Sequence, residues 1–170
     1  MSEARNLVAA VGAGRMGRGI AHVFAYGGHP VALVDFKPRG VAEFARLAAG
    51  AMAEIETNLR ALAGEGVFDA ALVPAILKRI AIVRAEEAAE SLCNAELVWE
   101  GVPERIEDKA DALARMSALA PDAIIASTTS TMLVTELQRH VARPERFLNA
   151  HFLNPAFLIP LVEVSPSPST

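Results

Sequence analysis

The chain has 170 residues but only one cysteine, Cys93, few aromatic residues (5%) and no long uncharged apolar run. One cysteine cannot form a disulfide framework or a cysteine metal site within the chain, which suits a reducing compartment. We also expect no metal-binding residues. The apolar runs are too short to cross a bilayer, and the first one does not match a signal peptide. The sequence therefore predicts a soluble, cytoplasmic protein with no membrane partner.

Clusters of positive charge are also missing. The formal net charge is −4 and no run of Lys and Arg is present, which argues against nucleic acid as a partner. The hydrophobic content of 52% is typical of a globular chain, and the length suits one domain with a sizeable core. We expect that domain to span residues 1–170, with a short leader at 1–6 and a flexible, Ser- and Pro-rich tail at 165–170.

Residues 7–35 (LVAAVGAGRMGRGIAHVFAYGGHPVALVD) contain the pattern that organises the chain. Two short apolar runs, 7–11 and 31–34, are typical of buried strands. Between them, a glycine-rich turn that fits G-x-G-x-x-G leads into a helix expected over about 15–26. A strand, turn, helix, strand and acid in this order predict a dinucleotide-binding βαβ unit.

The residues of this turn have separate physical roles. Gly12 allows the tight turn, Gly14 lets the backbone approach a pyrophosphate, and Gly17 lets the helix pack closely on the strand. Arg15 and Met16 begin the helix, where free N–H groups favour a phosphate, and complete the expected cofactor-binding turn. The alternative is a glycine turn that only packs a helix, which the flanking strands and the acid disfavour.

Asp35 is the acid of this unit and lies 18 residues after Gly17. The spacing is close to the ~20 residues expected for a carboxylate that accepts hydrogen bonds from an adenosine ribose. A carboxylate there repels a 2′-phosphate, so the sequence favours NAD over NADP. Lys37 and Arg39 keep NADP open as an alternative, because cations just beyond the acid can hold that phosphate.

The remaining chain alternates helical and strand patterns. Apolar residues recur every three or four positions over 40–63, which predicts a long helix, and a second helix over about 69–78 makes a helical hairpin after the second strand. Strands alternating with helices predict an α/β doubly wound parallel sheet, a Rossmann fold. The other expected strands are 80–83, 97–99, 123–126 and 147–150, and the other expected helices are 86–91, 103–119 and 134–140.

Chemically active side chains follow two of these strands. The hydroxyl-rich segment 127–131 follows one, at the sheet edge where ligands of parallel sheets bind. His151 follows another, and Glu163 lies within a later apolar run, where a buried carboxylate needs a partner. A His151–Glu163 pair would fix the imidazole tautomer and leave Nε2 as a base. The alternative is a strand-end histidine and a glutamate that faces water. We expect His22 and His29 to be packing or surface residues.

Four segments together resemble the NAD-binding domain of the 3-hydroxyacyl-CoA dehydrogenase family. That family includes 3-hydroxybutyryl-CoA dehydrogenases and the lambda-crystallin type of L-gulonate dehydrogenase. The resemblance covers nearly the whole chain in the same order. The segments are GAGRMGRGIAHVFAYGGHPVALVD, LVWEGVPERIEDK, IIASTTST and RFLNAHFLNPAFLIPLVEV.

The resemblance implies roles for individual residues. His151 would be the catalytic base and Glu163 its carboxylate partner. Ser130 would hydrogen-bond the substrate oxygen near the nicotinamide, and Asn154 would lie beside the reacting centre. The resemblance also matches Glu104 and Lys109 to positions that contact the cofactor.

The implied activity is the NAD-dependent oxidation of an (S)-3-hydroxyacyl-CoA to the 3-ketoacyl-CoA, as in fatty acid metabolism. Two departures keep alternatives open. Residues 40–66 contain no lysine to hold coenzyme A, which favours a small free hydroxy acid such as L-gulonate or carnitine. The family's C-terminal helical domain, through which we expect the full-length protein to form a homodimer, is absent, so the chain could also be an NAD-binding fragment with little turnover.

Overall fold

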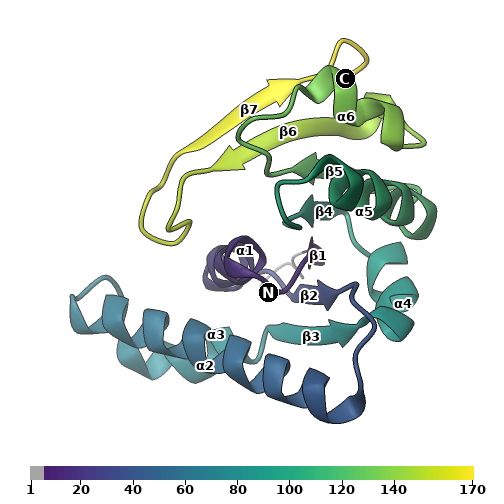
Figure 1. Ribbon diagram of the computed structural model, residues 1–170. Helices are drawn as coiled ribbons and strands as arrows, with labels where there is room; N and C mark the ends of the chain where they lie inside the picture. Colours follow the sequence, from purple (N-terminus) through teal and green to yellow (C-terminus); the bar gives the residue numbers. More distant parts are fainter. Residues whose placement is uncertain (1–5) are drawn as a thin grey trace.

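One sheet of seven strands runs through the protein (Figure 1) in the computed structural model, which describes residues 6–170. In chain order the strands are β1 (Val8–Val11), β2 (Val31–Asp35), β3 (Ile80–Arg84), β4 (Leu97–Glu100), β5 (Ile124–Ser127), β6 (Phe147–Phe152) and β7 (Val162–Pro166). Their order in the sheet is β3-β2-β1-β4-β5-β6-β7. All neighbours are parallel except β6 and β7, which form an antiparallel pair. The expected doubly wound Rossmann sheet is confirmed, with β7 as an antiparallel addition.

Helices cover both faces of this sheet (Figure 1). One hydrophobic cluster packs α1, α2 and α3 against one face, and a second packs α4, α5 and α6 against the other. Within residues 6–170 none of the helices has both the length and the apolar composition to cross a membrane. Their bounds are α1 (Arg15–Tyr26), α2 (Val41–Gly64), α3 (Val73–Leu77), α4 (Ala88–Cys93), α5 (Ile106–Leu119) and α6 (Val134–Leu137), with 3-10 turns at Ala70–Leu72, Ala85–Glu87, Gln138–His140 and Pro144–Arg146.

The predicted helical hairpin follows β2. Helix α2 buries only one stripe, at Ala51, Ile55 and Leu59, as its periodicity predicts. Asp69 accepts a hydrogen bond from the Ala71 N–H at 2.9 Å and so begins the second arm of the hairpin. That arm is a 3-10 turn followed by α3 rather than one regular helix, with a proline in the first turn of α3.

The expected start of one helix is wrong. The helix predicted from residue 103 begins at Ile106, because the preceding chain turns: the Val102 N–H bonds to the Glu100 side chain at 2.8 Å. Residues 165–170, which the sequence predicts to be a flexible tail, contact the sheet in the structure. Strand β7 extends to Pro166, and the Thr170 hydroxyl donates to the Phe147 carbonyl at 2.6 Å. The expected leader lies outside the described residues, except for residue 6.

The glycine turn lets α1 pack closely against β1, and this close packing can be tested by substitution. A Cβ on Gly17 would lie 1.9 Å from the Gly12 carbonyl oxygen, a backbone atom that cannot move aside cheaply. We expect Gly17→Ala to lower the free energy of unfolding by about 3 kcal/mol or more, measured by urea denaturation.

The matched control is Gly50→Ala in α2, where an added Cβ would meet nothing within 4 Å. Alanine is the better helix former, so this variant should gain about 0.5–1 kcal/mol. Equal effects of the two substitutions would contradict the role given to Gly17.

Candidate active site

The glycine turn opens a cradle at the start of α1. Gly12 has a φ of +105°, and its N–H donates to the Val34 carbonyl at 2.8 Å, which closes the turn against β2. An added Cβ on Gly14 would meet no atom within 4 Å, so this position faces open space where a phosphate can approach the backbone. The first N–H groups of α1 then form an anion-binding helix terminus.

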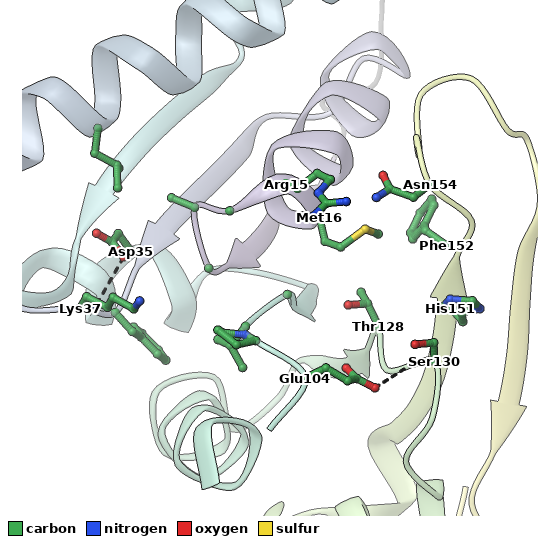
Figure 2. Close-up of a pocket in the computed structure, with 18 of the residues that line it drawn as sticks. Arg15, Met16, Asp35, Lys37, Glu104, Thr128, Ser130, His151, Phe152 and Asn154 are labelled. Atoms are coloured by element: carbon green, nitrogen blue, oxygen red, sulfur yellow. Dashed lines mark hydrogen bonds between the residues drawn. The ribbon is translucent and has the colours of Figure 1, made fainter. Parts of the chain in front are cut away.

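A cavity of about 720 Å³ extends from this cradle along the carboxyl ends of the strands (Figure 2). Its volume is in the range of cofactor and ligand pockets. Three of the sequence-predicted site residues, Gly17, Lys109 and Glu163, do not line it and support residues that do. The predicted residues that line it are Gly12, Gly14, Arg15, Met16, Asp35, Glu104, Ser130, His151 and Asn154.

Asp35 lies at one end of the cavity, and its neighbours bear on the choice of cofactor. It is 4% exposed and pairs with the Arg39 guanidinium, which also pairs with Glu43. Hydrogen bonds to these two carboxylates raise the pKa of Arg39. Arg39 also lines the cavity, and two of its nitrogens, Nε and Nη1, already donate to these carboxylates. Lys37 lines the cavity, and its backbone N–H donates to Asp35 at 3.4 Å (Figure 2).

A buried ion pair lies behind the cavity wall. Lys109 is 0% exposed, and its Nζ donates to both carboxylate oxygens of Glu100, each at 2.9 Å. The same Nζ pairs with Glu104 Oε2 at 3.1 Å. The Ser127 hydroxyl also donates to Glu100. Lys109 therefore does not reach the cavity itself. Sequence reasoning missed Glu100, although a glutamate at the end of the apolar run LVWE is a detectable signal.

Glu104 holds the loop after β5. Its Oε1 accepts from the Thr129 hydroxyl, from the Ser130 N–H at 3.1 Å, and from the Thr131 N–H and hydroxyl at 3.2 and 3.0 Å. Burial alone would raise the pKa of Glu104, but the Thr129 hydrogen bond and the charge of Lys109 outweigh it and lower the pKa to about 2. The ionised carboxylate thus fixes the backbone of Ser130 at the cavity wall (Figure 2).

His151 and Glu163 meet across the antiparallel pair of β6 and β7. They are register partners, and His151 Nδ1 lies 2.8 Å from Glu163 Oε2. Because an ionised carboxylate only accepts, Nδ1 carries the proton and Nε2 of a neutral imidazole carries the lone pair. His151 lies inside β6 rather than after a strand. The Glu163 side chain is 63% exposed, so its expected burial among apolar residues is wrong, since β7 is the sheet edge.

His22 is a packing residue, as the sequence predicts. It is 2% exposed, and its ring stacks on Phe157 with centroids 4.8 Å apart. Burial lowers its pKa to about 4, so it is neutral at physiological pH. His29 contacts the Asn6 carbonyl at 3.1 Å through Nδ1. Neither histidine lines the cavity.

Comparison with known proteins adds the decisive observation. The family profile described as "3-hydroxyacyl-CoA dehydrogenase, NAD binding domain" matches residues 7–170. The chain belongs to this family. The cradle, the open Gly14 position and the Asp35 carboxylate fit NAD, and the resemblance drawn from the four sequence segments is confirmed.

Individual relatives agree with this assignment. The chain is 39% identical over 158 residues to a 3-hydroxybutyryl-CoA dehydrogenase of Bradyrhizobium diazoefficiens, covering 92% of this chain and 50% of that protein. It is 35% identical to an L-carnitine dehydrogenase of Streptomyces griseus, covering 92% of this chain and 43% of that protein. The crystal structure of the (S)-3-hydroxybutyryl-CoA dehydrogenase PaaH1 from Ralstonia eutropha superposes with a TM-score of 0.85 at 28% identity, covering 97% of this chain and 55% of that one. The chain thus spans about half the length of these relatives.

The buried ion pair gives a prediction about stability in this NAD-binding domain. Removing the ammonium group in Lys109→Met leaves Glu100 buried without a counter-charge, so we expect a loss of about 3–5 kcal/mol in the free energy of unfolding. Lys78→Met, the same substitution at an exposed position, should change it by less than about 0.5 kcal/mol. Similar losses in the two variants would contradict the account of Lys109.

The lowered pKa of Glu104 gives a prediction about pH. The folded-state pKa of about 2 lies below the ordinary value of 4.5, so the ionised carboxylate stabilises the fold fully above pH 4.5. This stabilisation is lost as pH falls toward 2. Urea unfolding of the wild type and Glu104→Gln from pH 6 to pH 2 should show their stability difference shrinking over this range. A difference that is constant with pH would contradict it.

Proposed function

We propose that the protein containing this domain oxidises the 3-hydroxy group of an (S)-3-hydroxyacyl-CoA, with NAD as the hydride acceptor. The observation that carries the proposal is the 2.8 Å contact between Glu163 and His151, because His151 lines the cavity that also contains the glycine cradle and Ser130. A base and a hydroxyl donor at one end of a dinucleotide-sized cavity suit hydride removal from an alcohol. The identity of 39% to a 3-hydroxybutyryl-CoA dehydrogenase supports this substrate class.

Each of the site residues has a separate role in this reaction. His151 Nε2 takes the hydroxyl proton of the substrate, while Glu163 holds the Nδ1 tautomer and offsets the charge of the imidazolium that forms. Ser130, fixed by Glu104, donates to the substrate oxygen and orients the C–O bond. NAD, when bound, supplies the electron sink that accepts the C3 hydride. The roles that the sequence predicts for His151, Glu163 and Ser130 are kept in the proposal.

A small free hydroxy acid is the second candidate substrate. Residues 40–66 contain no lysine, and the polar residues that α2 presents beside the main cavity are Glu54 and Asn58, which offer no cation to coenzyme A phosphates. The identity of 35% to an L-carnitine dehydrogenase shows that such substrates occur among relatives.

The role of His151 can be tested by measuring NADH formation in the full-length protein that contains this domain. We expect His151→Ala to lower kcat by about 10²- to 10⁴-fold, because general-base assistance is lost. Glu163→Gln should cause a smaller loss, since it removes the negative charge but keeps a hydrogen-bond acceptor. His140→Ala, a histidine outside the cavity, is the matched control and should leave kcat unchanged.

Substrate choice is tested by comparing 3-hydroxybutyryl-CoA with free 3-hydroxybutyrate, L-gulonate and carnitine. Activity with the thioester alone would exclude a free hydroxy acid as the substrate. Activity with a free acid alone would exclude the acyl-CoA. An NAD-binding protein that oxidises none of them would support the binding-only alternative.

A further inference from the structure

A second cavity, of about 410 Å³, lies beside the first between α1, α2 and the loop after β6. Arg15 and Asn154 line both cavities and therefore form their boundary. Figure 2 shows the Arg15 guanidinium and the Asn154 amide facing each other, with Met16 below them and His151 farther along the same wall. A substrate that reacts at His151 can thus extend past Asn154 toward Arg15.

Two arginines line the second cavity, but only one has a free charge. Arg18 donates to the Ala13 carbonyl at 2.9 Å and pairs with Glu54, so its charge is balanced. Within residues 6–170, the Arg15 side chain makes no ion pair or hydrogen bond. The cavity therefore carries one unbalanced positive charge in a chain of net charge −4.

We propose that Arg15, assisted by the Asn154 amide, binds a carboxylate carried by the hydroxy substrate. A planar guanidinium matches a carboxylate with two parallel hydrogen bonds, and an amide N–H adds a third donor. This inference rests on the proposed hydride transfer at His151. The carboxylate has two possible sources: the C1 carboxylate of a free 3-hydroxy acid, or the far end of a hydroxydicarboxylyl thioester.

The phosphates of the cofactor are the competing ligand for Arg15. The glycine cradle already offers backbone N–H groups to a pyrophosphate, and Gly14 leaves space for it. The boundary that Arg15 forms with Asn154 instead opens toward Asn58 and Phe157 of the second cavity. That lining, which combines an amide and an aromatic ring, suits an organic acid.

The test compares the variants Arg15→Gln and Arg46→Gln of the full-length protein that contains this domain. Arg46 lies on α2, is exposed and lines neither cavity, so both variants lose the same charge. Two substrate pairs isolate the carboxylate: 3-hydroxybutyrate against 3-hydroxybutyramide, and 3-hydroxyadipyl-CoA against 3-hydroxyhexanoyl-CoA. Calorimetry of acetoacetate, adipate and NAD measures binding without turnover.

We expect Arg15→Gln to lower kcat/KM by about 10- to 100-fold for the carboxylate member of at least one pair, with little change for the partner that lacks the carboxylate. Binding of the matching probe, acetoacetate or adipate, should weaken equally, and the affinity for NAD should not change. A response of the first pair identifies a free acid, and a response of the second identifies the dicarboxylyl thioester. Arg46→Gln should behave as wild type.

Three outcomes would overturn the inference. They are equal losses for the substrates with and without the carboxylate, a weakened NAD affinity that accounts for the whole loss, and acetoacetate and adipate binding that Arg15→Gln leaves unchanged. Failure of the proposed function gives a different result: the wild type would then oxidise no hydroxy substrate, while the calorimetric comparison would still decide whether Arg15 binds a carboxylate.

Discussion

The ammonium group of Lys109 is buried between two carboxylates, and the geometry of the site depends on it. An uncompensated buried charge is costly, so Lys109 fixes Glu100 at the end of β4 and Glu104 in the next loop. Glu104 in turn accepts four hydrogen bonds from residues 129–131 after β5. One residue of α5 thereby connects two strand ends and places Ser130 at the cavity without contacting the cavity itself.

The side of the cavity that carries His151 does not depend on the Lys109 ion pairs. Strands β6 and β7 place His151 and Glu163 as register partners at the exposed edge of the sheet, where no buried charge is needed. The parallel order of the other strands brings their carboxyl ends, the glycine cradle and Asp35 to the same side. The site therefore combines a buried support for Ser130 with a base on β6 that is positioned by a residue of the edge strand β7.

Local features of this site were predictable from sequence. The glycine spacing, the apolar runs and Asp35 predict β1, α1 and β2 because their signals lie within 30 residues. The His151–Glu163 pair was one of two open interpretations. Features that depend on distant partners have no local signal in the sequence: Lys109 is buried by Glu100 and Glu104, and the tail beyond Pro166 is held by Phe147. Whether Arg15 is paired also depends on contacts that no local pattern encodes.

In the proposed function, His151, Glu163 and Ser130 form one side of a hydride-transfer site that faces NAD. The most direct measurement uses 3-hydroxybutyryl-CoA and 3-hydroxybutyrate deuterated at C3, with the full chain and NAD, and follows the label by mass spectrometry and NMR. Deuterium should appear on the nicotinamide ring of the reduced cofactor, and deuteration should slow the transfer. Deuterium released to water, or no labelled reduced cofactor with either substrate, would contradict it.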